Sequence, residues 1–157
     1  MELIVSKFQI SRRFCFIFLF IHFICYDVNA QATLTWDDLA EVFFYTKYHE
    51  ETEDYYLYPK FEDNILSFQN GLVKIRGYLI NLDLEYSVII LSKNPYASCF
   101  FCGMAGPETI IEIELNEPLN HIKLDQKAII KGKLILNESD FDHFNYILKN
   151  AKIEFVD

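Results

Sequence analysis

The second half of the chain alternates between apolar and polar residues, which is the pattern of strands that bury one face. After Gly71, Val73 and Ile75 alternate with Lys74 and Arg76, and similar segments follow up to the C-terminus. The predicted strands cover residues 73–82, 86–91, 111–115, 128–136 and 145–155. Five short strands at this spacing are typical of a small closed barrel.

Glycines inside two of these strands, Gly77 and Gly132, favour a barrel over a flat sheet, because tightly coiled strands bend at glycine. We expect a bulge at Gly77 and a kink near Asn150, where the apolar register of the last strand changes. The predicted fold is mainly β: a small OB-fold-like five-stranded barrel with one or two short helices. An open antiparallel sheet with a helix across one face is the alternative.

The residues before Gly71 predict two helices and a hairpin. A capping box, Thr35-Trp36-Asp37-Asp38, marks the start of a short helix. Apolar residues at helical spacing predict a second helix over 60–69, with Asn70-Gly71 as its stop. Between them, two aromatic segments, 42–48 and 55–58, predict a hairpin with an acidic tip, which we expect Pro59 to end.

Residues 1–30 have the three parts of a signal peptide. Lys7, Arg12 and Arg13 supply positive charge, an apolar run covers 14–26, and small residues precede a cleavage site after Ala30. The run is about 13 residues, whereas a membrane span needs about 20, so a retained anchor is the weaker interpretation. We therefore predict a signal peptide over 1–30, one domain over 31–157, an extracytoplasmic (periplasmic or secreted) location, and no stable transmembrane anchor after cleavage.

The predicted mature domain is strongly acidic. The whole chain has 14 basic and 23 acidic residues, and the leader contains three of the basic and two of the acidic ones, which leaves 11 against 21 and a net charge of −10. Such a charge repels phosphate backbones and anionic lipid. We therefore expect no nucleic acid partner, and cations or basic partners are favoured.

The long loop between the second and third predicted strands holds Cys99 and Cys102, the two cysteines left after the leader is removed. Three interpretations are open. The pair forms a structural disulfide or a buried thiol pair; it is a thiol-disulfide redox centre, in which Cys99 attacks and Cys102 resolves; or it binds a metal. A redox thiolate is usually stabilised by a helix N-terminus, and the glycines and proline after Cys102 argue against a helix there.

A metal site needs ligands beyond two sulfurs, and the sequence supplies candidates for them. We predict Cys99 and Cys102 as soft ligands, with Glu108 and His143 as the completing groups. His49 and His121 are better explained as solvated loop residues. Zn(II) or Cu(I) suits a thiolate site.

No enzyme signature is present in the sequence: it contains neither a phosphate-binding glycine loop nor a GxSxG elbow, and we assign no catalytic residue. The predicted function is that of a non-catalytic binding or accessory protein. Phe100 and Phe101, between the two cysteines, are the predicted contacts with a partner such as an envelope protein or a transporter component.

Three motifs carry a resemblance that covers most of the predicted mature domain. They are Trp36-Asp37-Asp38-Leu39, Val73-x-Ile75-x-Gly77-Tyr78-Leu79, and the segment from Cys99 to Glu108, which reads CFFCGxAGPE. With these motifs the chain resembles a family of exported bacterial proteins of unknown function. The resemblance implies no activity. It implies an association with transporters linked to metals or lipoproteins, which favours the metal interpretation.

Overall fold

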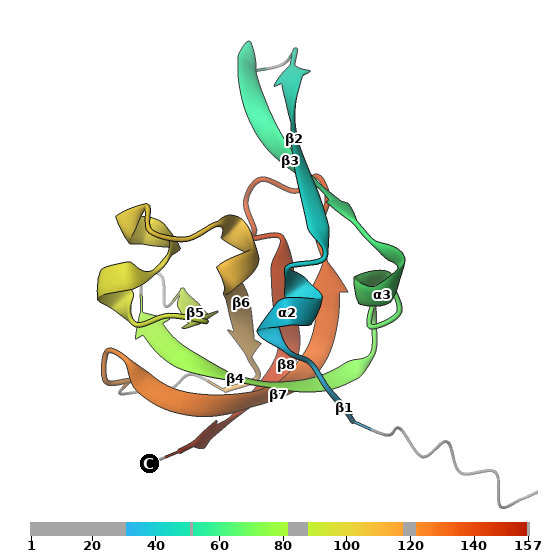
Figure 1. Ribbon diagram of the computed structural model, residues 1–157. Coiled ribbons are helices and arrows are strands. Elements are labelled where there is room, and N and C mark those ends of the chain that lie inside the picture. The colour runs from blue at the N-terminus through green and yellow to red at the C-terminus, as the bar shows by residue number, and fades with distance from the viewer. Residues whose placement is uncertain (1–30, 51, 82–87, 118–121, 157) are drawn as a thin grey trace, which may run out of the picture. The chain divides into compact units, whose positions relative to one another are not determined.

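The computed structural model describes residues 31–50, 52–81, 88–117 and 122–156. The predicted signal peptide, residues 1–30, and His121 lie outside the described residues. Gln31–Asp157 form one compact unit, shown in Figure 1. In the part of the chain that the structure describes, no helix combines the length and the apolar character needed to cross a membrane.

The unit consists mostly of strands. In chain order its elements are β1 (Ala32–Thr33), α2 (Trp36–Leu39), β2 (Val42–His49), β3 (Asp54–Phe61), α3 (Asp63–Leu66), β4 (Leu72–Asn81), β5 (Ile89–Ser92), the 3-10 turns η2 (Tyr96–Ser98), η3 (Phe100–Cys102) and η4 (Pro107–Thr109), β6 (Ile110–Leu115), β7 (Gln126–Leu136) and β8 (Tyr146–Phe155).

Five strands close into a barrel. Their order is β4-β5-β6-β8-β7, and β7 pairs back to β4. Neighbouring strands are antiparallel except β6 and β8, which are parallel. This order, with its parallel pair, is that of an OB-fold barrel, so the predicted fold class is confirmed. The short β1 adds to β4 in parallel, through Ala32 opposite Val73.

Alternation along the strands separates the barrel's interior from its surface. On β4, Val73, Ile75 and Leu79 are buried, and on β7 the buried series continues through Ile130 and Leu134. Each of the two short helices contributes a residue to the core: Leu39 of α2 and Ile65 of α3 are fully buried. Burying one Leu or Ile side chain stabilises the fold by about 1.5–3 kcal/mol relative to leaving it exposed.

The two strand glycines behave differently from each other. The β4–β7 register runs without interruption through Gly77, so the predicted bulge there is wrong. A side chain at Gly77 would lie 2.6 Å from the Ser92 carbonyl oxygen, and glycine is needed for this close approach. On β7, by contrast, the register to β8 shifts at Gly132, and Asn150 opposite it has a φ of 54°. The predicted kink near Asn150 is confirmed.

The helix starting at Thr35 is confirmed, with a complete capping box between Thr35 and Asp38. The second helix is shorter than predicted, because Phe61 belongs to β3 and α3 covers only Asp63–Leu66. The chain leaves this helical turn at Asn70, whose φ is 64°, so the left-handed residue is the asparagine and not Gly71.

The aromatic hairpin consists of β2 and β3, which pair only with each other among the described residues. It extends away from the barrel in Figure 1. Pro59 does not end it: this residue lies inside β3, opposite Phe44. A proline is accepted there because a two-stranded ribbon has free edges, where no ladder hydrogen bond from the proline nitrogen is required.

Candidate functional site

The cysteine loop, residues 93–109, connects β5 to β6 as a chain of three 3-10 turns. The second turn, η3, holds the CxxC motif: the Cys102 amide donates to the Cys99 carbonyl (3.2 Å), and the Gly103 amide donates to the Phe100 carbonyl (2.9 Å). Gly103 then leaves the turn with a φ of 68°. Residues three apart are eclipsed in a 3-10 turn, so Cys99 and Cys102 lie on the same side of the loop.

The two thiols occupy different environments. Cys99 is fully buried, Cys102 is exposed, and both are free. The Cys102 thiol donates to the Tyr96 carbonyl at 3.1 Å. Its pKa is raised, first by partial desolvation and then by the adjacent Cys99. A reactive redox cysteine has a lowered pKa, so this environment does not stabilise a thiolate at Cys102.

Glu108 lies over the neighbouring Gly106, in the space that a side chain at that position would fill. Its charge also acts on Tyr146, whose pKa is raised mainly by burial and secondly by Glu108. The Tyr146 hydroxyl donates to the Leu39 carbonyl at 2.7 Å, inside the barrel. Glu108 is therefore placed beside Gly106, close enough to the buried Tyr146 hydroxyl for its charge to act on it.

His143 lies on the loop 137–145, which connects β7 to β8. Its Nδ1 is 2.8 Å from Oε1 of Glu112 on β6, and the other oxygen of Glu112 accepts from the Phe144 amide at 3.0 Å. The pKa of His143 is raised, chiefly by the Glu112 hydrogen bond and further by the charges of Glu112, Asp140 and Glu114, against a smaller effect of desolvation.

Among the described residues, the potential metal ligands whose ligand atoms lie within 4.8 Å of one another are Glu112, Glu114 and His143. The four predicted ligands do not form such a group: Cys99 and Cys102 share one turn, Glu108 lies beside Gly106, and His143 is paired with Glu112. Glu114 is also paired with Lys149 at 3.2 Å.

A cleft of about 220 Å³ joins the cysteine loop, the loop 137–145 and the hairpin. Leu57 of β3, Phe100, Pro107, Phe141 and Phe144 give it apolar walls. Its polar lining comes entirely from the loop 137–145: Glu138, Ser139, Asp140, His143 and Asn145. Of the two predicted partner contacts, Phe100 lines the cleft, and Phe101 is 38% exposed and packs edge-on against Phe144 at 6.0 Å between ring centroids.

Asn137 organises the loop that forms this polar lining. Its side-chain nitrogen donates to the carbonyls of Asp140 (2.6 Å), His143 (3.2 Å) and Phe144 (3.3 Å). Its side-chain oxygen accepts from the amides of Ser139 (3.2 Å) and Asp140 (2.9 Å). One side chain thus satisfies much of the backbone of a nine-residue loop that has no regular secondary structure.

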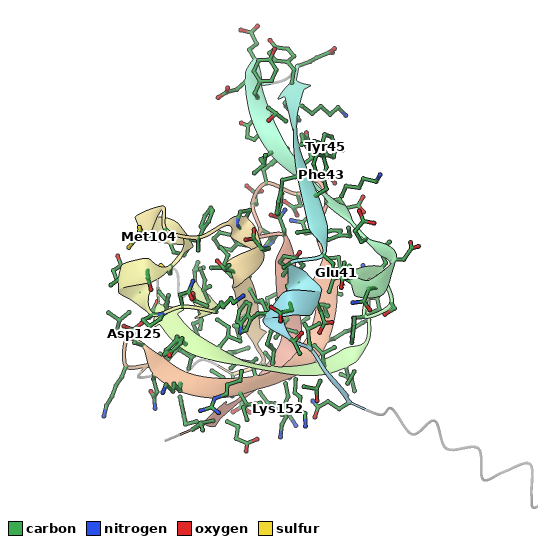
Figure 2. The ribbon with its side chains drawn as sticks, viewed as in Figure 1. Glu41, Phe43, Tyr45, Met104, Asp125 and Lys152 are labelled. Carbon is green, nitrogen blue, oxygen red and sulfur yellow. The ribbon has the colours of Figure 1, made fainter. Side chains whose placement is uncertain are left out.

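Phe141 connects this loop to the hairpin. Its ring lies 4.4 Å from that of Tyr56, 5.3 Å from that of Tyr58 and 5.5 Å from that of His49. The rest of the hairpin leaves large hydrophobic side chains in solvent. The exposed ones are Phe43 (61%), Tyr45 (42%), Tyr48 (44%), Tyr55 (68%) and Leu57 (51%). Figure 2 shows Phe43 and Tyr45 on the hairpin strand β2.

No family model and no curated protein matches the sequence. A solved structure, that of a DUF3299 family protein from Pseudomonas aeruginosa PAO1, is similar to this chain with a TM-score of 0.52 and 13% sequence identity. The match covers 82% of this chain and 97% of that one.

At this identity the likeness shows the fold alone. A structural neighbour from a domain family of unknown function agrees with the resemblance found in the sequence, but only at that coarse level. It says nothing about the CFFCGxAGPE loop, a metal or a redox role.

Sequence reasoning did not find three residues of this site: Glu112, Asn137 and Phe141. Glu112 is indistinguishable in the sequence from any outward residue of a strand. Asn137 had a usable signal, because an asparagine directly after a strand, followed by Glu-Ser-Asp, is typical of a side-chain-stabilised turn. Phe141 had none, since its packing against the hairpin depends on residues more than 80 positions away.

Proposed function

We propose that this chain is a non-catalytic binding or accessory module, and that its partner lies in the cleft and along the hairpin β2–β3. The observation that carries the proposal is that Tyr48, Tyr55 and Leu57 are exposed on one face of the two-stranded ribbon, and that Leu57 also lines the apolar cleft. Exposed apolar side chains gathered on one face in this way mark an interaction site. An isolated hairpin is at best marginally stable, so a bound partner would also stabilise it.

The chemistry of the partner follows from the charges around this surface. Glu138 and Asp140 line the cleft, and Glu50, Glu53 and Asp54 lie at the hairpin tip. A cleft with apolar walls and acidic residues around it suits an extended segment that combines aromatic or aliphatic side chains with lysine or arginine. An envelope protein or a transporter component with such a segment, in an extracytoplasmic compartment, is the partner that we propose.

A peptide titration tests this proposal. The probe is acetyl-Lys-Phe-Lys-Leu-Lys-amide carrying a fluorophore, and its charge-reversed control has Glu in place of Lys. We expect the basic peptide to bind and the acidic one not to bind. Phe100→Ala removes an apolar wall of the cleft and should weaken binding by about 10-fold or more, because truncating a buried aromatic anchor costs more than about 1.4 kcal/mol.

Met104→Ala is the matched control, since Met104 is on the same loop, is 72% exposed and does not line the cleft. We expect it to bind the peptide as the wild type does. Equal affinity for the two peptides, or unchanged binding by Phe100→Ala, would contradict the proposal.

A second candidate is a soft-metal site at Cys99 and Cys102, supported by the placement of both sulfurs on one turn. Because neither Glu108 nor His143 forms a ligand group with the two cysteines among the described residues, the site would offer two ligands. A structural Zn(II) site needs four, so two thiolates suit Cu(I) better. Elemental analysis of the reduced protein and of Cys99→Ser/Cys102→Ser tests this candidate: Cu(I) bound by the wild type alone supports it, and near-zero metal in both excludes it.

A further inference from the structure

The outward positions of β4, β7 and β8 form a positively charged face on an acidic protein. They carry Lys74, Arg76, Lys127, Lys131, Lys133 and Lys152, which we call the basic face. The whole chain has 23 acidic and 14 basic residues, yet the outward positions of these three strands hold a single carboxylate, that of Glu154. Lys149, which is also outward, is paired with Glu114 and is not counted in this set.

The strand register places like charges directly opposite one another on this face. Lys74 lies opposite Lys131, and Lys131 lies opposite Lys152, so that one row of three neighbouring strands consists of lysines. Like charges in directly opposed positions destabilise a sheet. Glu154 offsets part of this repulsion through an ion pair with Lys131 at 2.8 Å. In the described residues, the other five cations of the face have no carboxylate within 4.0 Å.

A groove of about 320 Å³ lies at one end of the basic face. Its cationic lining is Arg76, Lys93 and Lys127, and its aromatic walls are Trp36 and Tyr78. The Trp36 ring is held in place by its Nε1, which donates to the Arg76 carbonyl at 2.8 Å. Lys93 is only loosely paired, at 3.7 Å from Asp37. Three cations around one groove suit a phosphate group, and Trp and Tyr are the side chains that favour the membrane interface.

The chain enters the domain beside this face. The Gln31 side-chain amide donates to the Val73 carbonyl, and Thr33 pairs with Lys74. The first residues of the predicted mature domain therefore lie next to the lysine row.

We propose that the basic face docks on an anionic lipid surface, with the groove beside Trp36 receiving a headgroup phosphate. The net charge of −9 does not prevent this, because charges beyond a Debye length of about 8–10 Å are screened and the contacting face is cationic. Figure 2 shows Lys152 at the end of the domain opposite to the hairpin. Docking through the basic face thus leaves the hairpin and its cleft free for a protein partner.

Vesicle co-sedimentation of the full chain tests the proposal, with vesicles of phosphatidylcholine alone or mixed in equal parts with phosphatidylglycerol. The test variant is Lys74→Glu/Lys131→Glu/Lys152→Glu. The matched control is Lys47→Glu/Lys60→Glu/Lys123→Glu, which changes the net charge equally at exposed positions outside the six residues of the basic face. A neutral variant, Lys74→Gln/Lys131→Gln/Lys152→Gln, replaces the first if circular dichroism shows that the first is unfolded.

We expect the wild type to bind the phosphatidylglycerol vesicles and to bind less as salt is raised. The basic-face variant should lose on the order of 100-fold in affinity, because each lysine at an anionic surface contributes about fivefold, and the control should lose less than about threefold. Equal losses in the two variants, or equal binding to both kinds of vesicle, would overturn the proposal. Binding of a single-stranded oligonucleotide by the wild type without binding of the lipid would overturn it too.

Discussion

His143 and Glu112 form the best-defined ionic contact of the candidate site. The sequence marked His143 because a barrel end could bring it toward the cysteine loop, and the loop 137–145 does share a cleft with Phe100. The partner of the imidazole could not be predicted, because it depends on β6 and β8 lying side by side in parallel. The separation of Glu112 and His143 in the sequence gives no indication that their side chains are in contact.

The pH dependence of this contact has a definite sign. The Glu112 hydrogen bond raises the pKa of His143 above its ordinary value of 6.5. A folded-state pKa above the unfolded one means that the pair contributes stability below pH 6.5 and loses it as the pH rises through the folded pKa. The free energy of unfolding of the wild type should therefore exceed that of His143→Gln by more at pH 6 than at pH 8, both values chosen to bracket about 6.5.

An NMR titration of the His143 ring checks the cause. Glu112→Gln should lower the pKa of His143, whereas Glu138→Gln, on the same loop as His143 but outside this contact, should leave it near the wild-type value. A pKa of His143 that is unchanged in Glu112→Gln would contradict the assignment.

Asn137 is the residue on which the cleft's polar lining depends. Asn137→Ala leaves several backbone groups of the loop without their partner, which should lower the free energy of unfolding by about 1–3 kcal/mol. Urea unfolding measures this. Asn64→Ala is the control, since Asn64 makes one exposed hydrogen bond of 3.3 Å to Asp38, and it should cost less than about 0.5 kcal/mol. Equal costs for the two asparagines would contradict the role given to Asn137.

Local signals in the sequence predicted several elements well. The capping box at Thr35 and Asp38 needs only four residues, and the change of register near Asn150 is visible within one strand. The predictions were wrong at positions where contacts with other parts of the chain determine the local structure. Pro59 lies within β3 without ending it, because β3 has a free edge. Glycine is required at position 77 because β5 and Trp36 approach the backbone closely there, and not because the strand has a bulge.

The lysine row across β4, β7 and β8 makes a prediction about stability. Replacing Lys74 by threonine removes the like charge opposite Lys131 and should raise the free energy of unfolding by about 0.2–1 kcal/mol. Lys60→Thr is the matched control, because Lys60 is exposed on β3 and lies opposite Phe43. It introduces the same residue into a strand without relieving any repulsion. If thermal or urea unfolding shows the same gain for both variants, the row is not repulsive.

At the scale of the whole domain, net charge and charge distribution lead to different conclusions. The acidic total predicted that anionic lipid would be repelled, whereas the strand register collects six cations on one face. The amino-acid composition cannot show this distribution of charge, because the cations gather on one face only when the barrel closes and β4 pairs with β7. The acidic groups around the cleft and at the hairpin tip then give the domain two surfaces of opposite character.

The proposed function requires that the cleft and hairpin, and not the basic face, receive the protein partner. Chemical-shift mapping of the ¹⁵N-labelled protein during titration with acetyl-Lys-Phe-Lys-Leu-Lys-amide tests it in one measurement. We expect the amide signals of Leu57, Phe100 and Phe141 to shift together and saturate, while those of Lys74 and Lys131 do not move. Shifts spread evenly over the domain, or confined to the strands of the basic face, would contradict it.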